Sequence, residues 1–251
     1  MRNGRGIRYN ARMESLFRYV SPPSACGYLP EERWSLEYEM VASITPWEYE
    51  RKLEAGWRRF GAMLFQPRCP SCRACQSLRV KVGAFQPNRS QRRARRLNEN
   101  DVTLRVGPPR VSRAKLDLYD RFHASQADRK GWPLHPAKDP GSYRESFVNN
   151  PAFTEEWCYY LGDKLIGVGY TDVLPASLSA IYFFYDPDCR ERSLGTWNVL
   201  CLLERCAIEG AAYLYLGYYV EGCGSLEYKA NFRPNEVREP GGQWVDFLGI
   251  N

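Results

Sequence analysis

Residues 178–196, LSAIYFFYDPDCRERSLGT, decide the fold that the sequence predicts. The first eight residues are an apolar and aromatic run of the length of a buried strand, and the remainder reads as a polar loop. A helix is predicted after this loop, ending at Gly210, and residues 212–220, AYLYLGYYV, form another strand directly after it. The apolar side of this helix carries Val199, Leu202, Leu203 and Cys206.

The segments before this stretch extend the same sheet. Residues 155–174 predict two strands around a turn at Gly162 and Asp163, and residues 78–85 alternate between apolar and polar side chains as a strand does. Residues 113–131 predict a helix. This order of elements indicates an α+β protein with a mixed sheet. We expect a ligand-sized opening where the loop meets the N-terminus of the last helix.

The first 76 residues predict a small irregular module with one well-marked helix. Thr45 is a typical N-cap, Pro46 suits the first helical position, and Glu48 completes a capping box. The helix is predicted to run on to Gly61. Its apolar face would comprise Tyr49, Leu53, Trp57 and Phe60.

Length and composition fit a folded protein with a large core. The chain has 251 residues, 44% of them hydrophobic, and a net charge of +6. We expect an N-terminal cysteine-bearing domain over residues 1–76 and a second domain over residues 77–251. No apolar run approaches the roughly 18 residues of a membrane helix, and the N-terminus lacks the apolar core of a signal peptide. A cytoplasmic monomer without membrane contact is therefore expected.

Several enzyme classes find no support in the sequence. Only two histidines are present, His123 and His135, so a Ser-His or Cys-His catalytic relay is not expected. The phosphate-binding loop of nucleotide hydrolases, the glycine fingerprint of dinucleotide-binding enzymes and the H-E-x-x-H motif of zinc proteases are all absent.

Three cysteines near the end of the first module, Cys69, Cys72 and Cys75, are spaced C-x2-C-x2-C, and Cys26 could supply a fourth thiolate. Four thiolates suit either zinc or an iron-sulfur cluster. The alternative is that the trio are small buried apolar residues. The odd total of nine cysteines argues against a disulfide framework. The remaining cysteines are expected to pack in strands and helices: Cys158, Cys189, Cys201, Cys206 and Cys223.

Residues 89–96 contain five arginines and no acidic residue. Ser90 is the predicted N-cap of the following helix, which would place Arg92 and Arg93 in its first turn. There the helix dipole disfavours each cation by about 0.3 to 1 kcal/mol, so an anionic partner is expected. Phosphate is the natural candidate, because guanidinium groups bind it bidentately with salt-dependent affinity. The alternative is an ordinary charged surface.

The loop at residues 190–197, RERSLGTW, follows a strand and leads into a helix. Backbone N–H groups in such a place can hold an anion or a carbonyl oxygen. The loop has one glycine, Gly195, where the phosphate loops of acetyltransferases usually have two. Asp186, at the start of the preceding loop, could serve the site or only form a turn.

Seven motifs, in this order along the chain, resemble the aminoacyl-tRNA-protein transferases, most closely the bacterial aspartate/glutamate leucyltransferases, relatives of eukaryotic arginyltransferases. The resemblance implies a GNAT-type acyltransferase fold after the cysteine-bearing domain. It also implies transfer of leucine from leucyl-tRNA to the α-amine of proteins that begin with Asp or Glu, the reaction of an N-degron pathway. The motifs are CGYLP at 26–30, RCPSCRACQSLRV at 68–80, FQPNRSQRRARR at 85–96, FFYDP at 183–187, SLGTW at 193–197, YLYLGYYV at 213–220 and EYKANFRP at 227–234.

Under this interpretation the transfer needs no cofactor and no covalent nucleophile. The tRNA ester is already activated, and the attacking α-amine has a pKa of about 7.7 to 8. We expect the backbone of Leu194, Gly195 and Thr196 to contact the ester carbonyl or the 3' end of the tRNA. Asp186 is expected to orient the amine. The expected substrate pocket comprises Tyr218, Tyr228 and Lys229, and the cations expected to meet the acidic acceptor or tRNA phosphate are Arg89, Arg92, Arg93, Lys229 and Arg233.

Other functions stay open at the level of sequence. Arginyl-tRNA could replace leucyl-tRNA as the donor. A peptidoglycan-bridge enzyme that uses charged tRNA, or a coenzyme A-dependent acetyltransferase, would share much of the same chemistry. A metal-containing module that binds RNA without transferring anything is the non-enzymatic alternative.

Overall fold

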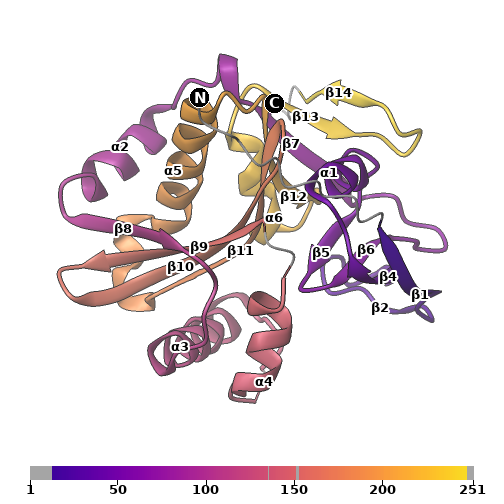
Figure 1. Cartoon of the computed structure of the whole chain (residues 1–251), viewed down its shortest axis with the longest axis horizontal. Helices are drawn as coiled ribbons and strands as arrows, with labels where there is room; N and C mark the ends of the chain where they lie inside the picture. Colours follow the sequence, from indigo (N-terminus) through magenta and orange to yellow (C-terminus); the bar gives the residue numbers. More distant parts are fainter. Residues whose placement is uncertain (1–12, 135, 151–152, 248–251) are drawn as a thin grey trace, which may run out of the picture.

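An eight-stranded sheet forms the centre of the molecule in the computed structural model, which describes residues 13–134, 136–150 and 153–247 (Figure 1). Its strand order is β14-β13-β7-β12-β11-β10-β9-β8. The pair β11 and β12 is parallel and the other neighbours are antiparallel, so the predicted mixed sheet is confirmed. The strands are β7 Gln76–Lys81, β8 Val102–Gly107, β9 Thr154–Leu161, β10 Lys164–Val173, β11 Ser177–Tyr185, β12 Tyr213–Tyr219, β13 Asn235–Arg238 and β14 Trp244–Asp246.

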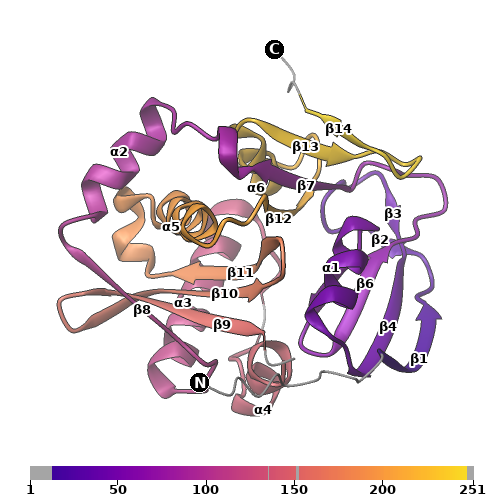
Figure 2. The same cartoon turned by 45° about the horizontal axis from the view of Figure 1, so that its top comes forward.

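Helices cover both faces of this sheet (Figure 2). On one face, α5 (Leu194–Glu209) lies beside α2 (Arg89–Asn98), and on the other α3 (Arg113–Lys130) lies near α4 (Pro140–Tyr143). Successive side chains of a strand point to opposite faces of the sheet, so one strand contributes to the apolar core on each face. In β9, Trp157 and Tyr159 pack on the side of α5, whereas Cys158 packs on the side of α3. The shorter helical turns are η1 Val82–Ala84, η2 Arg144–Val148, η3 Pro187–Arg192, α6 Gly224–Glu227 and η4 Tyr228–Asn231.

Most elements predicted for the large sheet are confirmed. The helix at 113–131 and the helix after the loop both end at the expected glycines, Gly131 and Gly210, which adopt left-handed conformations. Two details were wrong. The N-cap of α2 is Asn88 rather than Ser90, because Asn88 forms a capping box with Gln91. The predicted strand at 78–85 ends at Lys81 and continues as η1.

The first part of the chain is more regular than predicted. It forms a four-stranded antiparallel sheet of order β1-β4-β6-β5, together with the short pair β2 and β3. The capping box at Thr45 is confirmed, and it begins α1. The elements are β1 Glu14–Val20, β2 Ser24–Ala25, β3 Arg33–Trp34, β4 Leu36–Ser43, α1 Pro46–Glu54, β5 Arg58–Phe60 and β6 Met63–Pro67.

The predicted end of α1 was wrong. The helix ends at Glu54, with Ala55 as its C-cap, so Trp57 and Phe60 lie beyond it. Gly61 instead turns the chain between β5 and β6 with a φ of 53°. A Cβ atom at Gly61 would lie 2.1 Å from the carbonyl oxygen of Glu145, so only glycine fits against η2 at this point.

The small sheet packs directly against the large one (Figures 1 and 2). One apolar core combines Leu53, Trp57 and Leu64 with Leu174 and Tyr215, which belong to the large-sheet part of the chain. A buried ion pair between Arg59 and Asp172 joins the same parts. In the described part of the chain, no helix is both long and apolar enough to cross a membrane.

Candidate active site

The large sheet separates along the boundary between β11 and β12. The two strands pair only from Ser177 opposite Tyr213 to Ser179 opposite Tyr215. Beyond this point β11 runs on to Tyr185 and β12 to Tyr219 without further pairing between them. Backbone groups that would join the two strands therefore face the gap and need other partners.

A cavity of about 560 Å³ lies at this separation. Its walls come from β11 and β12, from the N-terminus of α5, from α3 and the segment after it, from the small sheet, and from α6 and η4. The apolar part of the lining is largely aromatic, with Phe60, Phe65, Phe122, Trp132, Ile181, Phe183, Leu216 and Leu226. The predicted opening between the loop and the last helix therefore exists in the structure.

The N-terminus of α5 borders this cavity. The preceding residue, Ser193, has a left-handed backbone with a φ of 54°, and its side chain does not cap the helix. Leu194, Gly195 and Thr196 supply the first-turn N–H groups, which have no intrahelical acceptor. These three residues were predicted from the sequence, and their position suits an oxyanion or carbonyl contact.

Arg58 and Lys229 replace the strand hydrogen bonds that are lost where β11 and β12 separate. The Nη2 atom of Arg58 donates to the carbonyl oxygen of Ala180 on β11 at 2.9 Å. The Nζ atom of Lys229 donates to the carbonyl oxygen of Tyr218 on β12 at 2.7 Å. Both side chains line the cavity, and their exposures are only 6% for Arg58 and 9% for Lys229.

Burial lowers the pKa of Lys229 to about 7, and the nearby positive charge of Arg58 acts in the same direction. Burial is the larger cause, because an ammonium group loses its hydration when it leaves water. Lys229 was predicted from the sequence, but Arg58 was not. The available signal was the pair Arg58-Arg59 in the otherwise apolar run GWRRFGAMLF, residues 56–65. In a strand, two successive side chains point to opposite faces, so the two arginines need separate partners.

Two predicted tyrosines also line the cavity. Tyr218 is buried, and its hydroxyl donates to the carbonyl oxygen of Gly56 at 3.0 Å, which fixes the ring between β12 and the small sheet. Tyr228 is partly exposed at the mouth formed by η4. The structure thus brings six predicted residues to one cavity: Leu194, Gly195, Thr196, Tyr218, Tyr228 and Lys229.

Asp186 lies outside the lining of this cavity, contrary to its predicted role next to the amine. Its side chain is fully buried at the end of β11, where it caps η3 and pairs with Arg121 and Lys164, each at 2.7 Å. Burial acts to raise the pKa of Asp186, but the hydrogen bonds from Lys164, from the Asp188 N–H and from Arg121 lower it overall. The geometry gives Asp186 the role of an anchor for the loop before α5.

The predicted arginines lie on the outer surface rather than in the cavity. Arg89, Arg92 and Arg93 are exposed on α2, and no described carboxylate forms an ion pair with them. Arg233 is also exposed, and its Nε atom donates to the carbonyl oxygen of Ala230 at 3.2 Å. None of these four residues is part of the cavity lining.

His123, one of the two histidines, is connected to the cavity wall. The Nε2 atom of His123 lies 2.8 Å from the hydroxyl of Tyr182, a lining residue, and its Nδ1 atom lies 2.8 Å from the carbonyl oxygen of Tyr119. Since a carbonyl oxygen only accepts, Nδ1 carries a proton, and in the neutral imidazole Nε2 accepts from the Tyr182 hydroxyl. His135 lies outside the described residues.

Comparison with known proteins decides the family. The model of the arginine-tRNA-protein transferase N terminus matches residues 24–93, and that of its C terminus matches residues 114–239. The chain belongs to the arginine-tRNA-protein transferase family. The transferase is 38% identical over 236 residues to the aspartate/glutamate leucyltransferase of Aeromonas hydrophila, covering 90% of this chain and 92% of the relative. It is 34% identical over 223 residues to the same enzyme of Helicobacter hepaticus, covering 88% and 92%.

Among solved structures, the transferase is similar to FemX with a TM-score of 0.47 and 8% sequence identity, covering 87% of this chain and 84% of FemX. This value is too low to decide the fold. The family resemblance derived from the seven sequence motifs is confirmed by the family models and by the two relatives.

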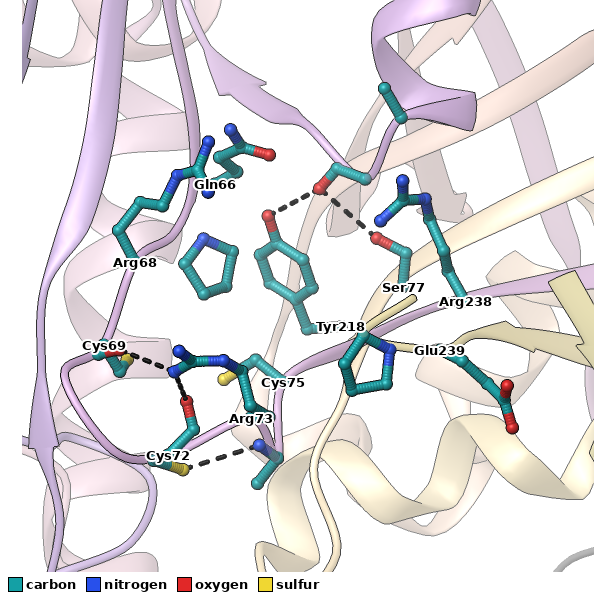
Figure 3. A pocket seen from close by; sticks show the side chains of 15 residues that line it. Gln66, Arg68, Cys69, Cys72, Arg73, Cys75, Ser77, Tyr218, Arg238 and Glu239 are labelled. Atoms are coloured by element: carbon teal, nitrogen blue, oxygen red, sulfur yellow. Dashed lines mark hydrogen bonds between the residues drawn. The ribbon is translucent and has the colours of Figure 1, made fainter. Parts of the chain in front are cut away.

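Cys69, Cys72 and Cys75 border a second, smaller hollow of about 240 Å³, which Tyr218 also lines (Figure 3). Arg73 closes the cysteine loop by donating from Nη1 to the carbonyl oxygens of Cys69 and Cys72, at 2.6 and 2.8 Å. Burial raises the pKa of the Cys75 thiol to about 12, and the neighbouring thiols of Cys69, Cys26, Cys72 and Cys223 add to the effect. The predicted cysteines therefore gather in one region.

The described ranges contain no group of three or more histidine, cysteine or acidic side chains that could hold a metal ion. The Sγ atoms of Cys26 and Cys72 accept hydrogen bonds from the N–H groups of Tyr28 and Ala74, each at 3.4 Å. Zinc or an iron-sulfur cluster stays a prediction from the spacing alone, and metal analysis of anaerobically isolated protein is its test.

Proposed function

We propose that this transferase moves leucine from leucyl-tRNA to the α-amine of proteins that begin with Asp or Glu. Relatives with 34 to 38% identity along nearly the whole chain carry the name aspartate/glutamate leucyltransferase, which supports this reaction. The structural observation that carries the proposal is a cavity lined by the N-terminus of a helix and by two buried cations, Arg58 and Lys229, without acidic partners among the described residues.

The chemistry requires positioning more than covalent catalysis. The α-nitrogen attacks the ester carbon, the bond between that carbon and the 3' oxygen of the tRNA breaks, and the proton lost by the amine is balanced by the proton gained by the 3' hydroxyl. The N–H groups of Leu194, Gly195 and Thr196 would stabilise the charge that develops on the carbonyl oxygen. A neutral α-amine is already available near its pKa of about 7.7 to 8.

The cavity lining supports leucine over arginine as the transferred residue. Its aromatic and aliphatic side chains suit an apolar side chain. A guanidinium group on the donor would meet the positive charges of Arg58 and Lys229 in the same cavity. Like charges in a poorly solvated cavity repel, so the site disfavours an arginyl donor.

The exposed arginines of α2 are proposed to bind the phosphates of the tRNA, because no acid of the described chain neutralises them. We also propose a GNAT-type arrangement, which the separation of the parallel strands β11 and β12 beside α5 supports. A charged-tRNA donor would place the reaction in the cytoplasm.

A transfer assay with labelled donors tests the proposal. Leucyl-tRNA and arginyl-tRNA are each offered with peptides that begin with Asp, Glu, Asn or Lys. We expect leucine transfer to the Asp and Glu peptides and none to peptides whose α-amine is acetylated. Transfer of arginine alone would contradict the donor, and a preference for Lys peptides would contradict the acceptor.

A further inference from the structure

Arg58 and Lys229 approach one point of the cavity from two separate parts of the chain. Arg58 belongs to β5 of the small sheet, and Lys229 belongs to η4 near the end of the chain. Gly217, at a bulge of β12 with a φ of 87°, lies between them. A Cβ atom at Gly217 would be 3.4 Å from Nζ of Lys229 and 3.6 Å from Nη2 of Arg58. The absence of a side chain here leaves room beside both cations.

Neither cation has an acidic partner among the residues that the structure describes. The Nη1 atom of Arg58 is buried and has no hydrogen-bond partner at all. Burial of an unpaired cation is unfavourable, and a second cation beside it makes it more so. The site therefore has an unsatisfied donor and excess positive charge that an anion would neutralise.

We propose that Arg58 and Lys229 together bind the side-chain carboxylate of the first residue of the acceptor protein. This assignment rests on the proposed function, which supplies an acceptor with an acidic first residue. The carboxylate would accept from the free Nη1 of Arg58 and from Lys229. The helix N-terminus that suits the ester carbonyl lines the same cavity, so the α-amine of that residue can lie between the two subsites.

A phosphate of the tRNA is the other anion that could reach this pair. The burial of both cations in a cavity with aromatic walls favours the side-chain carboxylate of a peptide. The exposed arginines of α2 already offer a surface for phosphates. An acceptor carboxylate and a tRNA phosphate give different results when Arg58 and Lys229 are replaced.

The experiment compares Arg58→Met and Lys229→Met with the wild-type chain and with Arg105→Met. Arg105 is an exposed arginine on the edge strand β8, so its removal changes net charge without touching the cavity. Peptides that begin with Glu or with the isosteric Gln are compared in two assays. One measures Kd by calorimetry without tRNA, and the other measures kcat/KM with leucyl-tRNA.

We expect the wild type and Arg105→Met to prefer the Glu peptide by about tenfold to a hundredfold, the range of one buried charge-assisted hydrogen bond. In Arg58→Met and Lys229→Met this preference should fall toward onefold, while the KM for leucyl-tRNA stays unchanged. A Glu preference that survives in both folded variants would overturn the proposal.

A raised KM for leucyl-tRNA with an unchanged Glu preference would also overturn it, and would assign the pair to a tRNA phosphate. Thermal unfolding shows whether each variant is folded. If Arg58→Met does not fold, the preference for the Glu peptide is measured in Lys229→Met and in the charge-preserving variant Arg58→Lys, and these two variants decide the test. If the wild type transfers no leucine to any peptide, the proposed function fails, whereas the calorimetric Glu preference still tests the subsite.

Discussion

Two neighbouring regions, the cavity wall at Arg58 and the interface between the sheets at Arg59, contain adjacent arginines of β5 in opposite electrostatic situations. Arg59 is fully buried and binds Asp172 through Nε at 3.0 Å, and it also donates to Asn150 and to the carbonyl oxygen of Gly61. Arg58 is nearly as buried but has no acid. The difference separates a cation that holds the fold together from one that is available to a ligand.

The sharpest test of this contrast is stability. Arg59→Met should reduce the free energy of unfolding by about 3 to 5 kcal/mol, because it leaves Asp172 buried without its cation. Arg58→Met should cost only about 0.5 to 1.5 kcal/mol, the contribution of one ordinary hydrogen bond. Denaturant unfolding of the two variants measures both values.

The loss in Arg59→Met should shrink as the pH falls. Burial already raises the pKa of Asp172, although Arg59 opposes the rise. Without Arg59 the carboxyl would protonate more readily, and a neutral group costs less to bury. Equal losses in the two variants would remove the distinction between the regions.

The second test uses pH at the cavity wall. Because the pKa of Lys229 in the folded chain is about 7, well below its ordinary value, the folded state holds fewer protons than the unfolded state above that pH. The wild type should therefore gain about 1.4 kcal/mol of stability per pH unit relative to Lys229→Met as the pH rises above 7.

The groups whose charges act on Lys229 in this test are Arg58 from β5, Cys223 at the start of α6 and Cys75 before β7. Unfolding of the wild type and of Lys229→Met between pH 6 and 8.5 checks the difference. A difference that does not change with pH would mean that Lys229 stays charged throughout, as in an ordinary exposed lysine.

The smallest effect is expected on the outer surface. The double variant Arg92→Ala/Arg93→Ala should weaken tRNA binding and make the slope of log affinity against log salt shallower by about 1.5, because about two phosphate contacts are lost. A matched double variant at exposed positions outside α2, Arg105→Ala/Arg129→Ala, should leave the slope unchanged. Filter binding at several salt concentrations measures both. The same slope in all proteins would leave α2 as an ordinary charged surface.

The large sheet could be predicted from the sequence because its elements follow simple patterns. The apolar side of α5 and the alternation along β9 and β10 both point to buried faces, and glycines mark the ends. The cavity could also be located, since Leu194 to Thr196 and the motif around Lys229 were recognisable.

The small sheet could not be predicted because its buried face contains acids. In β4 the buried side chains include Glu37 and Glu39, which are paired with Arg18, Arg68 and Lys52. A pattern based on hydrophobicity reads this face as solvent-exposed. The sequence also does not reveal that Arg58 lacks an acidic partner among the residues described. Only the fold shows that Asp172 pairs with Arg59 and not with the adjacent Arg58.

The placement of Arg58 on the small sheet divides two properties of the enzyme between distant parts of the chain. The N–H groups proposed for the ester lie on α5, more than a hundred positions after β5. Under the proposed assignment, substitution of Arg58 would thus change which proteins are selected while the bond-forming N–H groups of α5 stay intact. Acceptor choice can in this way evolve separately from catalysis. The shared core around Leu53, Leu174 and Tyr215 holds the small sheet and the large sheet in fixed positions relative to each other.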